Sequence, residues 1–599
     1  MDIDSLKKSY KQKATSPIEV VRDIYARIRL IGERPVWITL VCEEDSLARA
    51  CELEAVSDRD ALPLFGIPFA VKDNFDVAGL PTTAACAAFS REAASTAEAV
   101  QRLLNAGAIL IGKTNMDQFA TGLVGTRTPY GICSSVFNSE YVSGGSSSGS
   151  AVSVASGLVS FALGTDTAGS GRVPATFNQL VGLKPTRGLV STDGLLPACR
   201  TLDCVSVFAE TCPDVARVLQ VIQGFDAKDA YSRAATPGEG ATPWTASRFR
   251  FGVPTEESLE FFGDDEARLA YAHAVEALAG LGGVAIGFDY ELFRSAASLL
   301  YSGPWVAERT AAVKEFAEQH PNAFDLTVGA IIRGGERYSA VDGFLGAYAL
   351  QEIRRKTDAV LEEVDFLLLP TAPTTYRVSE VLAEPIELNS RLGYYTNFVN
   401  LLDMAAVAIP AGMKGNGLPF GVSLIGKAFT DDGLLSMADR LHRELATTLG
   451  GSDRLLADTS AIANGAAPHG CVLMAVVGAH LSGQPLNWQL TQRKARLVRA
   501  VRTHADYRLY ALPNTAPPKP GLVYSPGFGG QGIELEVWAM PEDTVGTFLM
   551  GIPAPLSLGT VRLEDGTSVK GFLCEPAGIE GAEDITHLGG WRAYLETLK

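Results

Sequence analysis

Several features that would place the chain in a common class are missing from its sequence. No apolar run reaches the ~18 residues of a membrane-spanning helix, and the starting residues MDIDSLKK lack the charge-then-apolar order of a secretory signal. The nine cysteines are scattered without CxxC spacing, which fits reduced thiols and implies no metal site. The net charge of −17 argues against nucleic acid or an anionic membrane as a partner. We therefore expect a cytoplasmic protein that needs no metal or other cofactor.

Histidine is also scarce where a catalytic base would be useful. The chain has seven histidines, the first of them His273, and none lies in a motif near the serine-rich segments described next. A serine nucleophile needs a group that takes its proton, and histidine is the usual partner. Lysine is therefore the alternative to consider.

Two segments of small residues dominate the first third of the chain. They are YVSGGSSSGS at 141–150 and GTDTAGSGR at 164–172. No Gly-Lys-Ser/Thr follows the glycines, which argues against a phosphate-binding loop. A flexible linker is the plain alternative, but residues 151–163 predict a buried helix and strand, which do not flank linkers. The pattern favours a catalytic loop.

A candidate base precedes these segments. Lys72 ends the apolar run FGIPFAVK at 65–72, as a strand that carries a side chain into a pocket would. A lysine desolvated there would lose part of its preference for charge and could act as a base. The alternatives are a surface lysine after a strand and a rival base, Lys113, in GKTNMDQF at 112–119.

Together, Lys72 and the two small-residue segments resemble the amidase signature family of serine hydrolases. The resemblance covers residues 60–190 closely and extends loosely to about residue 450. It implies a Ser-cisSer-Lys triad with Lys72, rather than Lys113, as the base. Ser146 would be the cis-serine, after a cis peptide bond from Gly145, and Ser170 would be the nucleophile.

The implied mechanism passes a proton along the triad. Neutral Lys72 would take a proton from Ser146, which would take one from Ser170 as it attacks the carbonyl, and the same pair would return a proton to the leaving nitrogen. Asp166 and Arg172 are expected to brace the turn. The predicted oxyanion hole consists of backbone N–H groups from Thr167, Ala168 and Gly169.

The order of predicted elements indicates an α/β fold. Ser16-Pro17 marks a helix start, residues 35–40 predict a strand, and residues 95–98 predict a capping box before a helix that Gly107 ends. Residues 108–111 then return as a strand, which implies a crossover connection in a parallel or mixed sheet. With later buried strands, this agrees with the amidase signature fold, a mixed twisted sheet with helices on both faces.

A substrate-recognition segment is predicted at 300–309, LYSGPWVAER. Pro304 suits the first turn of a helix, which would place Tyr301 just before that helix and Arg309 in its second turn. A solvated arginine on an amphipathic helix is the alternative. The segment resembles the specificity segment of allophanate hydrolases within the family. That resemblance implies that Tyr301 hydrogen-bonds a small ureido substrate and that Arg309 binds its carboxylate.

The length of 599 residues predicts more than one domain. We expect an amidase signature domain at 1–450, a linker at 451–470, and a C-terminal domain at 471–599 with many short strands. The last region resembles the gamma-glutamylcyclotransferase-like C-terminal domain of allophanate hydrolases, a small α+β or β-barrel domain. The resemblance places His480 at the mouth of the barrel and Glu536 at the position of that fold's catalytic glutamate, although a Gly-Glu-Leu-Tyr pattern is absent.

The resemblance as a whole implies an amidohydrolase that acts on linear amides and converts allophanate to ammonia and carbon dioxide. The C-terminal domain would assist decarboxylation of N-carboxycarbamate through His480, or would serve only assembly. The expected partners are the substrate, a second copy in a homodimer, and a biotin-dependent urea carboxylase in urea degradation. The alternatives are another amidase, such as the glutaminase-type subunit of a tRNA amidotransferase, and a catalytically silent assembly protein.

Overall fold

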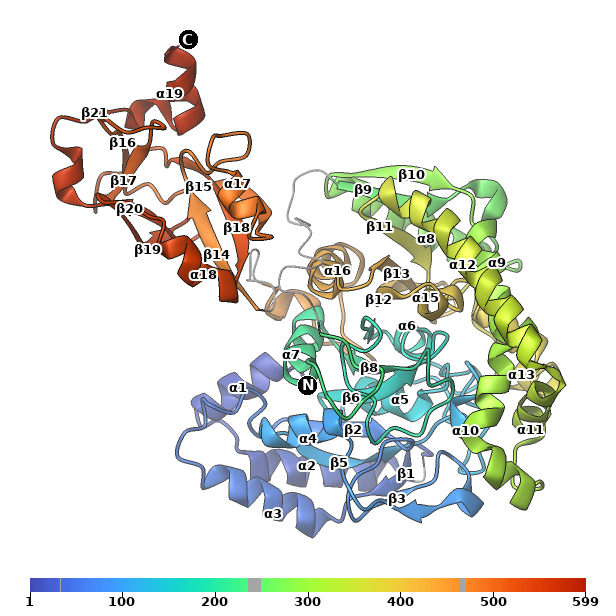
Figure 1. The fold of residues 1–599 in the computed structure, drawn as a ribbon. Coiled ribbons are helices and arrows are strands. Elements are labelled where there is room, and N and C mark those ends of the chain that lie inside the picture. Colours follow the sequence, from blue (N-terminus) through green and yellow to red (C-terminus); the bar gives the residue numbers. More distant parts are fainter. Residues whose placement is uncertain (33, 235–248, 463–469, 599) are drawn as a thin grey trace. The chain divides into compact units, whose positions relative to one another are not determined.

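The computed structural model describes residues 1–32, 34–234, 249–462 and 470–598, so part of the predicted linker lies outside the described residues. The chain forms two units (Figure 1). The N-terminal unit contains the described residues up to Ile462, and the C-terminal unit contains those from Gly470 onward. None of the helices in the described ranges combines the length and apolar character that crossing a membrane requires.

The N-terminal unit is built on one large mixed sheet, which confirms the predicted α/β class. Strands β2 and β5, and β2 and β6, pair in parallel, whereas β6 and β8 pair antiparallel. A small hairpin of β3 (Pro81–Thr82) and β4 (Arg91–Glu92) stands apart from this sheet. Within the described residues the large sheet has eleven strands, in the order β1 (Trp37–Leu40), β5 (Ile109–Thr114), β2 (Pro68–Lys72), β6 (Phe161–Asp166), β8 (Cys204–Ala209), β7 (Val181–Lys184), β12 (Met404–Met413), β13 (Pro419–Lys427), β11 (Phe366–Pro370), β9 (Phe249–Pro254) and β10 (Gly283–Phe288).

Helices surround this sheet (Figure 1). They are α1 (Ile3–Lys11), α2 (Pro17–Ile31), α3 (Glu43–Glu54), α4 (Glu98–Asn105), α5 (Ser148–Ala155), α6 (Val173–Phe177), α7 (Cys212–Ile222), α8 (Asp265–Gly280), α9 (Glu291–Ser302), α10 (Trp305–Gln319), α11 (Leu326–Gly334), α12 (Ala340–Glu362), α13 (Val378–Ala383), α14 (Glu387–Leu392), α15 (Phe398–Leu401) and α16 (Asp431–Leu445). Helix α5 packs on β2 and β6, and α16 packs on β12 and β13. Every residue of β2, β5 and β6 is buried, so the site at their ends rests on a rigid core.

Local capping signals predict one helix start correctly and another incorrectly. Helix α2 begins with the capping box of Ser16 and Glu19. The capping box predicted at residues 95–98 is wrong, because α4 begins at Glu98 after Ala97 and has no side-chain cap. The predicted partner Glu98 is engaged elsewhere, since its carboxylate accepts a hydrogen bond from Arg102 Nε at 2.8 Å and its backbone N–H donates to the carbonyl oxygen of Asp193 at 3.2 Å.

The segment around Tyr301 also differs from its prediction. Tyr301 precedes α10, as predicted, but it lies in the last turn of α9, a helix that the sequence analysis did not predict, and Gly303 and Pro304 separate the two helices. Helix α10 begins at Trp305 without a side-chain cap, and Arg309 lies in its second turn, as predicted. Proline suits a helix start as well as the loop before it, so the sequence did not reveal that a helix also ends here.

The C-terminal unit has little helix and many short strands. Its five-stranded sheet has the order β15 (Arg496–Arg502), β18 (Glu534–Pro541), β14 (Cys471–Val476), β20 (Ser568–Cys574) and β19 (Leu556–Arg562). A second sheet has the order β17 (Pro520–Tyr524), β16 (Tyr507–Ala511) and β21 (Glu583–Asp584). The helices are α17 (Trp488–Thr491), α18 (Glu542–Leu549) and α19 (Trp591–Thr597). A separate apolar core, which includes Met474, Leu509 and Trp591, stabilises this unit.

Candidate active site

Strand β2 delivers Lys72 to the centre of the N-terminal unit. The side chain is fully buried, and its Nζ lies 2.7 Å from Ser146 Oγ and 2.7 Å from Thr165 Oγ1. Ser146 belongs to the first small-residue segment, and Thr165 to the second. The lysine therefore meets both segments that the sequence singled out.

Burial changes the protonation of this lysine. Desolvation lowers the pKa of Lys72 to about 7, although Asp117, Asp203 and Asp166 favour its charged form, and Arg309 lowers the pKa further. An amine with this pKa is half neutral near pH 7. Lys72 can therefore accept a proton under ordinary conditions.

The backbone around Ser146 is tightly fixed. The Gly145–Ser146 peptide bond is cis, as predicted. The carbonyl oxygen of Ser146 accepts a hydrogen bond from the N–H of Asp117 at 3.0 Å. A Cβ atom at Gly145 would lie 2.1 Å from a carboxylate oxygen of Asp117, so glycine alone fits this position.

An internal ion pair braces the turn that carries Ser170. Asp166 and Arg172 are both fully buried and pair at 2.9 Å, as predicted. The carboxylate of Asp166 also accepts the N–H groups of Gly169 and Gly171 at 2.8 and 3.1 Å. Burial opposes its ionisation, but the attraction and hydrogen bonds of Arg172 outweigh burial, so the pKa of Asp166 lies below its ordinary value.

Ser170 lies near the end of this braced turn and is only 3% exposed. Residues 146–147 and 164–165 lie side by side, because the hydroxyl of Ser147 donates to the carbonyl oxygen of Thr165 at 3.2 Å. Among the three predicted oxyanion donors, Gly169 already donates its N–H to Asp166. The N–H groups of Thr167 and Ala168 are therefore the better candidates for oxyanion donors.

The predicted recognition pair, Tyr301 and Arg309, also comes together. The Arg309 guanidinium lies 5.5 Å from the centre of the Tyr301 ring. Arg309 is 3% exposed and donates weakly to the carbonyl oxygen of Ala120 and to the hydroxyl of Thr121, at 3.4 and 3.2 Å. Its Nε is buried without a hydrogen-bond partner, and no carboxylate of the described chain forms an ion pair with it. A buried, unpaired arginine is costly unless an anion binds it.

Lys113, the rival base, has a different environment. Its Nζ donates to the carbonyl oxygen of Pro81 at 2.6 Å and to Thr82 Oγ1 at 2.8 Å, and forms a buried ion pair with Asp73 at 3.3 Å. Burial lowers its pKa, against the attraction of Asp73. These oxygens occupy the ammonium group, which favours Lys72 as the base.

Sequence reasoning missed two residues of this site. Thr165, the second partner of Lys72, lies within the GTDTAGSGR segment, where its position directly before Asp166 was available as a signal. Asp203 accepts a hydrogen bond from the Thr167 hydroxyl at 2.5 Å. It belongs to no motif, and only the fold brings it to the site.

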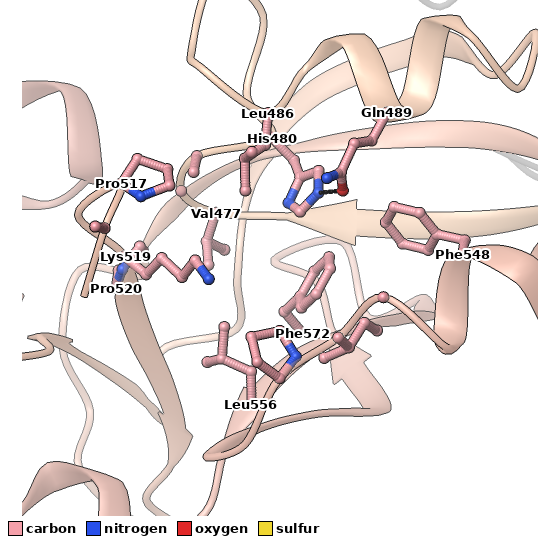
Figure 2. A pocket seen from close by; sticks show the side chains of 16 residues that line it. Val477, His480, Leu486, Gln489, Pro517, Lys519, Pro520, Phe548, Leu556 and Phe572 are labelled. Atoms are coloured by element: carbon pink, nitrogen blue, oxygen red, sulfur yellow. Dashed lines mark hydrogen bonds between the residues drawn. The ribbon is translucent and has the colours of Figure 1, made fainter.

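In the C-terminal unit, His480 lines a cavity of about 210 Å³ (Figure 2). Its ring stacks on Phe572, and its Nε2 lies 2.9 Å from Gln489 Oε1. Figure 2 shows that the other ring nitrogen of His480 and the ammonium group of Lys519 both point into the cavity. Burial lowers the pKa of His480, and the charges of Lys519 and Arg493 lower it further, whereas the hydrogen bond with Gln489 raises it. The net pKa lies below its ordinary value, so the ring is neutral at pH 7.

Glu536 does not join His480 in lining that cavity. One of its carboxylate oxygens accepts from the N–H and hydroxyl of Ser482 and from Trp538 Nε1, and the other pairs with Arg592 at 2.7 Å. These donors occupy the carboxylate. Among the described residues, no cluster of His, Cys, Asp or Glu side chains is arranged to hold a metal ion.

Known proteins resemble both units. The family model "Amidase" matches residues 19–435, and the model "Allophanate hydrolase C-terminal domain" matches residues 472–596. A urea amidolyase of Saccharomyces cerevisiae is 44% identical over 94% of this chain, and the chain spans about a third of that relative's length, 31%. A glutamyl-tRNA(Gln) amidotransferase subunit from Agathobacter rectalis is 33% identical over 72% of this chain and 92% of its own. The crystal structure of Kluyveromyces lactis allophanate hydrolase matches with a TM-score of 0.80 and 40% identity, over 100% of this chain and 99% of that one.

Proposed function

Because the chain belongs to the amidase family of amidohydrolases, we propose that it hydrolyses the terminal amide of allophanate. The observation that carries the proposal is the buried, unpaired Arg309, which faces Tyr301 and acts electrostatically on the low-pKa Lys72. A small amide that carries a carboxylate would neutralise this arginine. Allophanate has that chemistry, and the matched solved structure is an allophanate hydrolase.

The proposed chemistry uses the predicted triad. Neutral Lys72 takes a proton from Ser146, and Ser146 takes one from Ser170 as its oxygen bonds to the amide carbon. The N–H groups of Thr167 and Ala168 stabilise the oxyanion. A proton returns through Ser146 to the leaving nitrogen, ammonia departs, and water hydrolyses the acyl-enzyme to release N-carboxycarbamate.

The C-terminal unit has a separate role in this proposal. N-carboxycarbamate binds in the His480 cavity, where the cation of Lys519 attracts its carboxylates and the free ring nitrogen of His480 contacts an N–H or O–H group during loss of carbon dioxide. Both carboxylate oxygens of Glu536 already accept hydrogen bonds, so Glu536 is better suited to holding Ser482 and Arg592 in place than to catalysis. A role limited to assembly is the alternative for this unit.

Partners and boundaries belong to the same proposal. The related urea amidolyases support association with a biotin-dependent urea carboxylase. The proposal also places the chain in the cytoplasm and pairs it with a second copy as a homodimer. The boundary between the two domains would lie within the linker predicted at 451–470.

The substrate is tested by ammonia release from allophanate, malonamate, biuret and glutamine. We expect the highest kcat/KM with allophanate, and no ammonia from any of these amides with the Ser170→Ala variant. Preference for glutamine would instead favour the amidotransferase-type activity of the second group of relatives.

A further inference from the structure

Asp203 is a buried carboxylate at the junction of the two halves of the proposed site. It directly precedes β8 and is 6% exposed. It accepts hydrogen bonds from the Thr167 hydroxyl at 2.5 Å and from the N–H groups of Ala198 and Cys199, at 2.8 and 3.2 Å. Asp203 therefore ties the start of the nucleophile turn to the loop at 196–203.

The same loop holds the helix that carries Arg309. The N–H and hydroxyl of Thr201 both donate to the carboxylate of Glu308, at 2.7 and 2.8 Å. At its other end, Leu196 exchanges two hydrogen bonds with Asn74, two residues beyond Lys72. One loop thus contacts the segments that carry the base, the nucleophile turn and the recognition arginine.

The negative charge of Asp203 is stabilised by hydrogen bonds and by the more distant charge of Arg309. No cation of the described chain forms an ion pair with it. Burial raises its pKa to about 6, while Thr167, the two amides and the charge of Arg309 oppose that rise. In turn, Asp203 favours the charged form of Lys72. Other ionisable groups around it are Cys199, and, in a cavity of about 240 Å³ that Asp203 also lines, Asp193, Arg200, Lys228 and Asp229.

We propose that Asp203 is a positioning residue that couples substrate recognition at Arg309 to the oxyanion turn. Its hydrogen bond fixes the Thr167 end of the turn, and its loop fixes α10, so a carboxylate bound at Arg309 presents its amide to donors that are already in place. This inference rests on the proposed function. It adds a residue that contacts neither the substrate nor the triad.

The first test is Asp203→Asn, with Asp226→Asn as the matched control. Asp226 is also a buried carboxylate, 8% exposed, that accepts a serine hydroxyl, from Ser191 at 2.7 Å. We expect Asp203→Asn to lower kcat for allophanate at least about tenfold with KM changed less than about threefold. The acid limb of kcat/KM should move to lower pH, because a charge that favours protonated Lys72 is lost. The control should change neither quantity, and a loss of kcat without movement of the acid limb would overturn the proposal.

A second pair of variants guards against misfolding of Asp203→Asn. Thr167→Val removes the hydroxyl, and Thr167→Ser restores it. We expect a loss of about tenfold for the valine variant and recovery to within about threefold for the serine variant. Equal activity of the two variants would overturn the positioning role.

The coupling itself is measured by a double-mutant cycle. In an Arg309→Ala background, Asp203→Asn should cost less than about threefold, because the carboxylate anchor is already lost. Additive losses would overturn the coupling. If the wild type hydrolysed another amide and not allophanate, the proposed function would be wrong. The Thr167→Val and Thr167→Ser variants, assayed on that other amide, would still test the positioning role of Asp203.

Discussion

The two units place their candidate catalytic groups in opposite kinds of environment. In the N-terminal unit, Lys72 lies fully buried among hydroxyls and fixed charges, with the Asp166–Arg172 ion pair bracing the turn beside it. In the C-terminal unit, His480 lines a cavity, packs against the rings of Phe548 and Phe572, and has its Nε2 2.9 Å from Gln489 Oε1. The first environment suits bond-breaking chemistry in which charge develops, and the second suits binding of a small anion beside a neutral base.

The largest expected effect separates the two buried lysines of the N-terminal unit. Lys72→Ala should lower kcat at least about 10³-fold with little loss of stability, because the variant lacks the proposed base. Lys113→Ala should instead lower thermal stability, by about 3–5 kcal/mol, because it leaves Asp73 buried without its partner. Steady-state kinetics and thermal melts of both variants check this. Similar activity losses in the two variants, without a difference in stability, would make Lys113 a competing base.

The next effect tests recognition in the same unit. Arg309→Ala should lower kcat/KM for allophanate about 100-fold and that for uncharged biuret far less, since the proposed contact of Arg309 is to a carboxylate, which biuret lacks. Kinetics with both substrates measure the ratio. An equal loss on the two substrates would contradict the role of Arg309.

A smaller effect is expected in the C-terminal unit. His480→Ala should leave the first release of ammonia unchanged and slow the release of carbon dioxide about tenfold. Parallel assays of ammonia and carbon dioxide distinguish the steps, and a chain truncated at about residue 460 should behave likewise. Loss of ammonia release on truncation would favour an assembly role for the unit.

The smallest effect concerns Glu536. Its oxygens accept hydrogen bonds from Ser482, Trp538 and Arg592. Glu536→Gln should therefore lower the free energy of unfolding of the C-terminal unit by about 1–3 kcal/mol, and its Tm by a few degrees, without changing the release of carbon dioxide. Calorimetry and the carbon dioxide assay check the two parts. A slower release of carbon dioxide at unchanged Tm would restore the catalytic role expected from the resemblance.

The sequence was informative where a motif and its contacts are local. The segments around Lys72, Ser146 and Ser170 were found because small residues and a buried strand leave a recognisable pattern, and strands such as β1 and β5 followed from apolar runs. The capping box at 95–98 was wrong because the side chain of Glu98 pairs with Arg102 and its backbone N–H donates to Asp193, a contact between distant segments. The helix that contains Tyr301 was missed because the end of α9 left no signal.

Contacts between distant segments could not be predicted. Asp203 meets Thr167 across 36 positions, and the donors around Glu536 come from a loop and a helix 54 and 56 positions away. Such contacts depend on strand order, and no local sequence pattern encodes them. The same limit applied to the engagement of the Gly169 N–H by Asp166, because a turn motif does not reveal which of its N–H groups remain free.

The protonation state of Lys72 is measured most directly through the reactivity of Ser170. A serine-reactive fluorophosphonate would label Ser170, and mass spectrometry would follow the labelling rate against pH. In the proposed mechanism the neutral amine is the base, so the rate should fall as pH drops through about 7, where Lys72 becomes charged, and labelling should be lost in Lys72→Ala. Labelling of Lys72→Ala at the wild-type rate, or a rate independent of pH between about 5 and 9, would contradict catalysis by a neutral lysine.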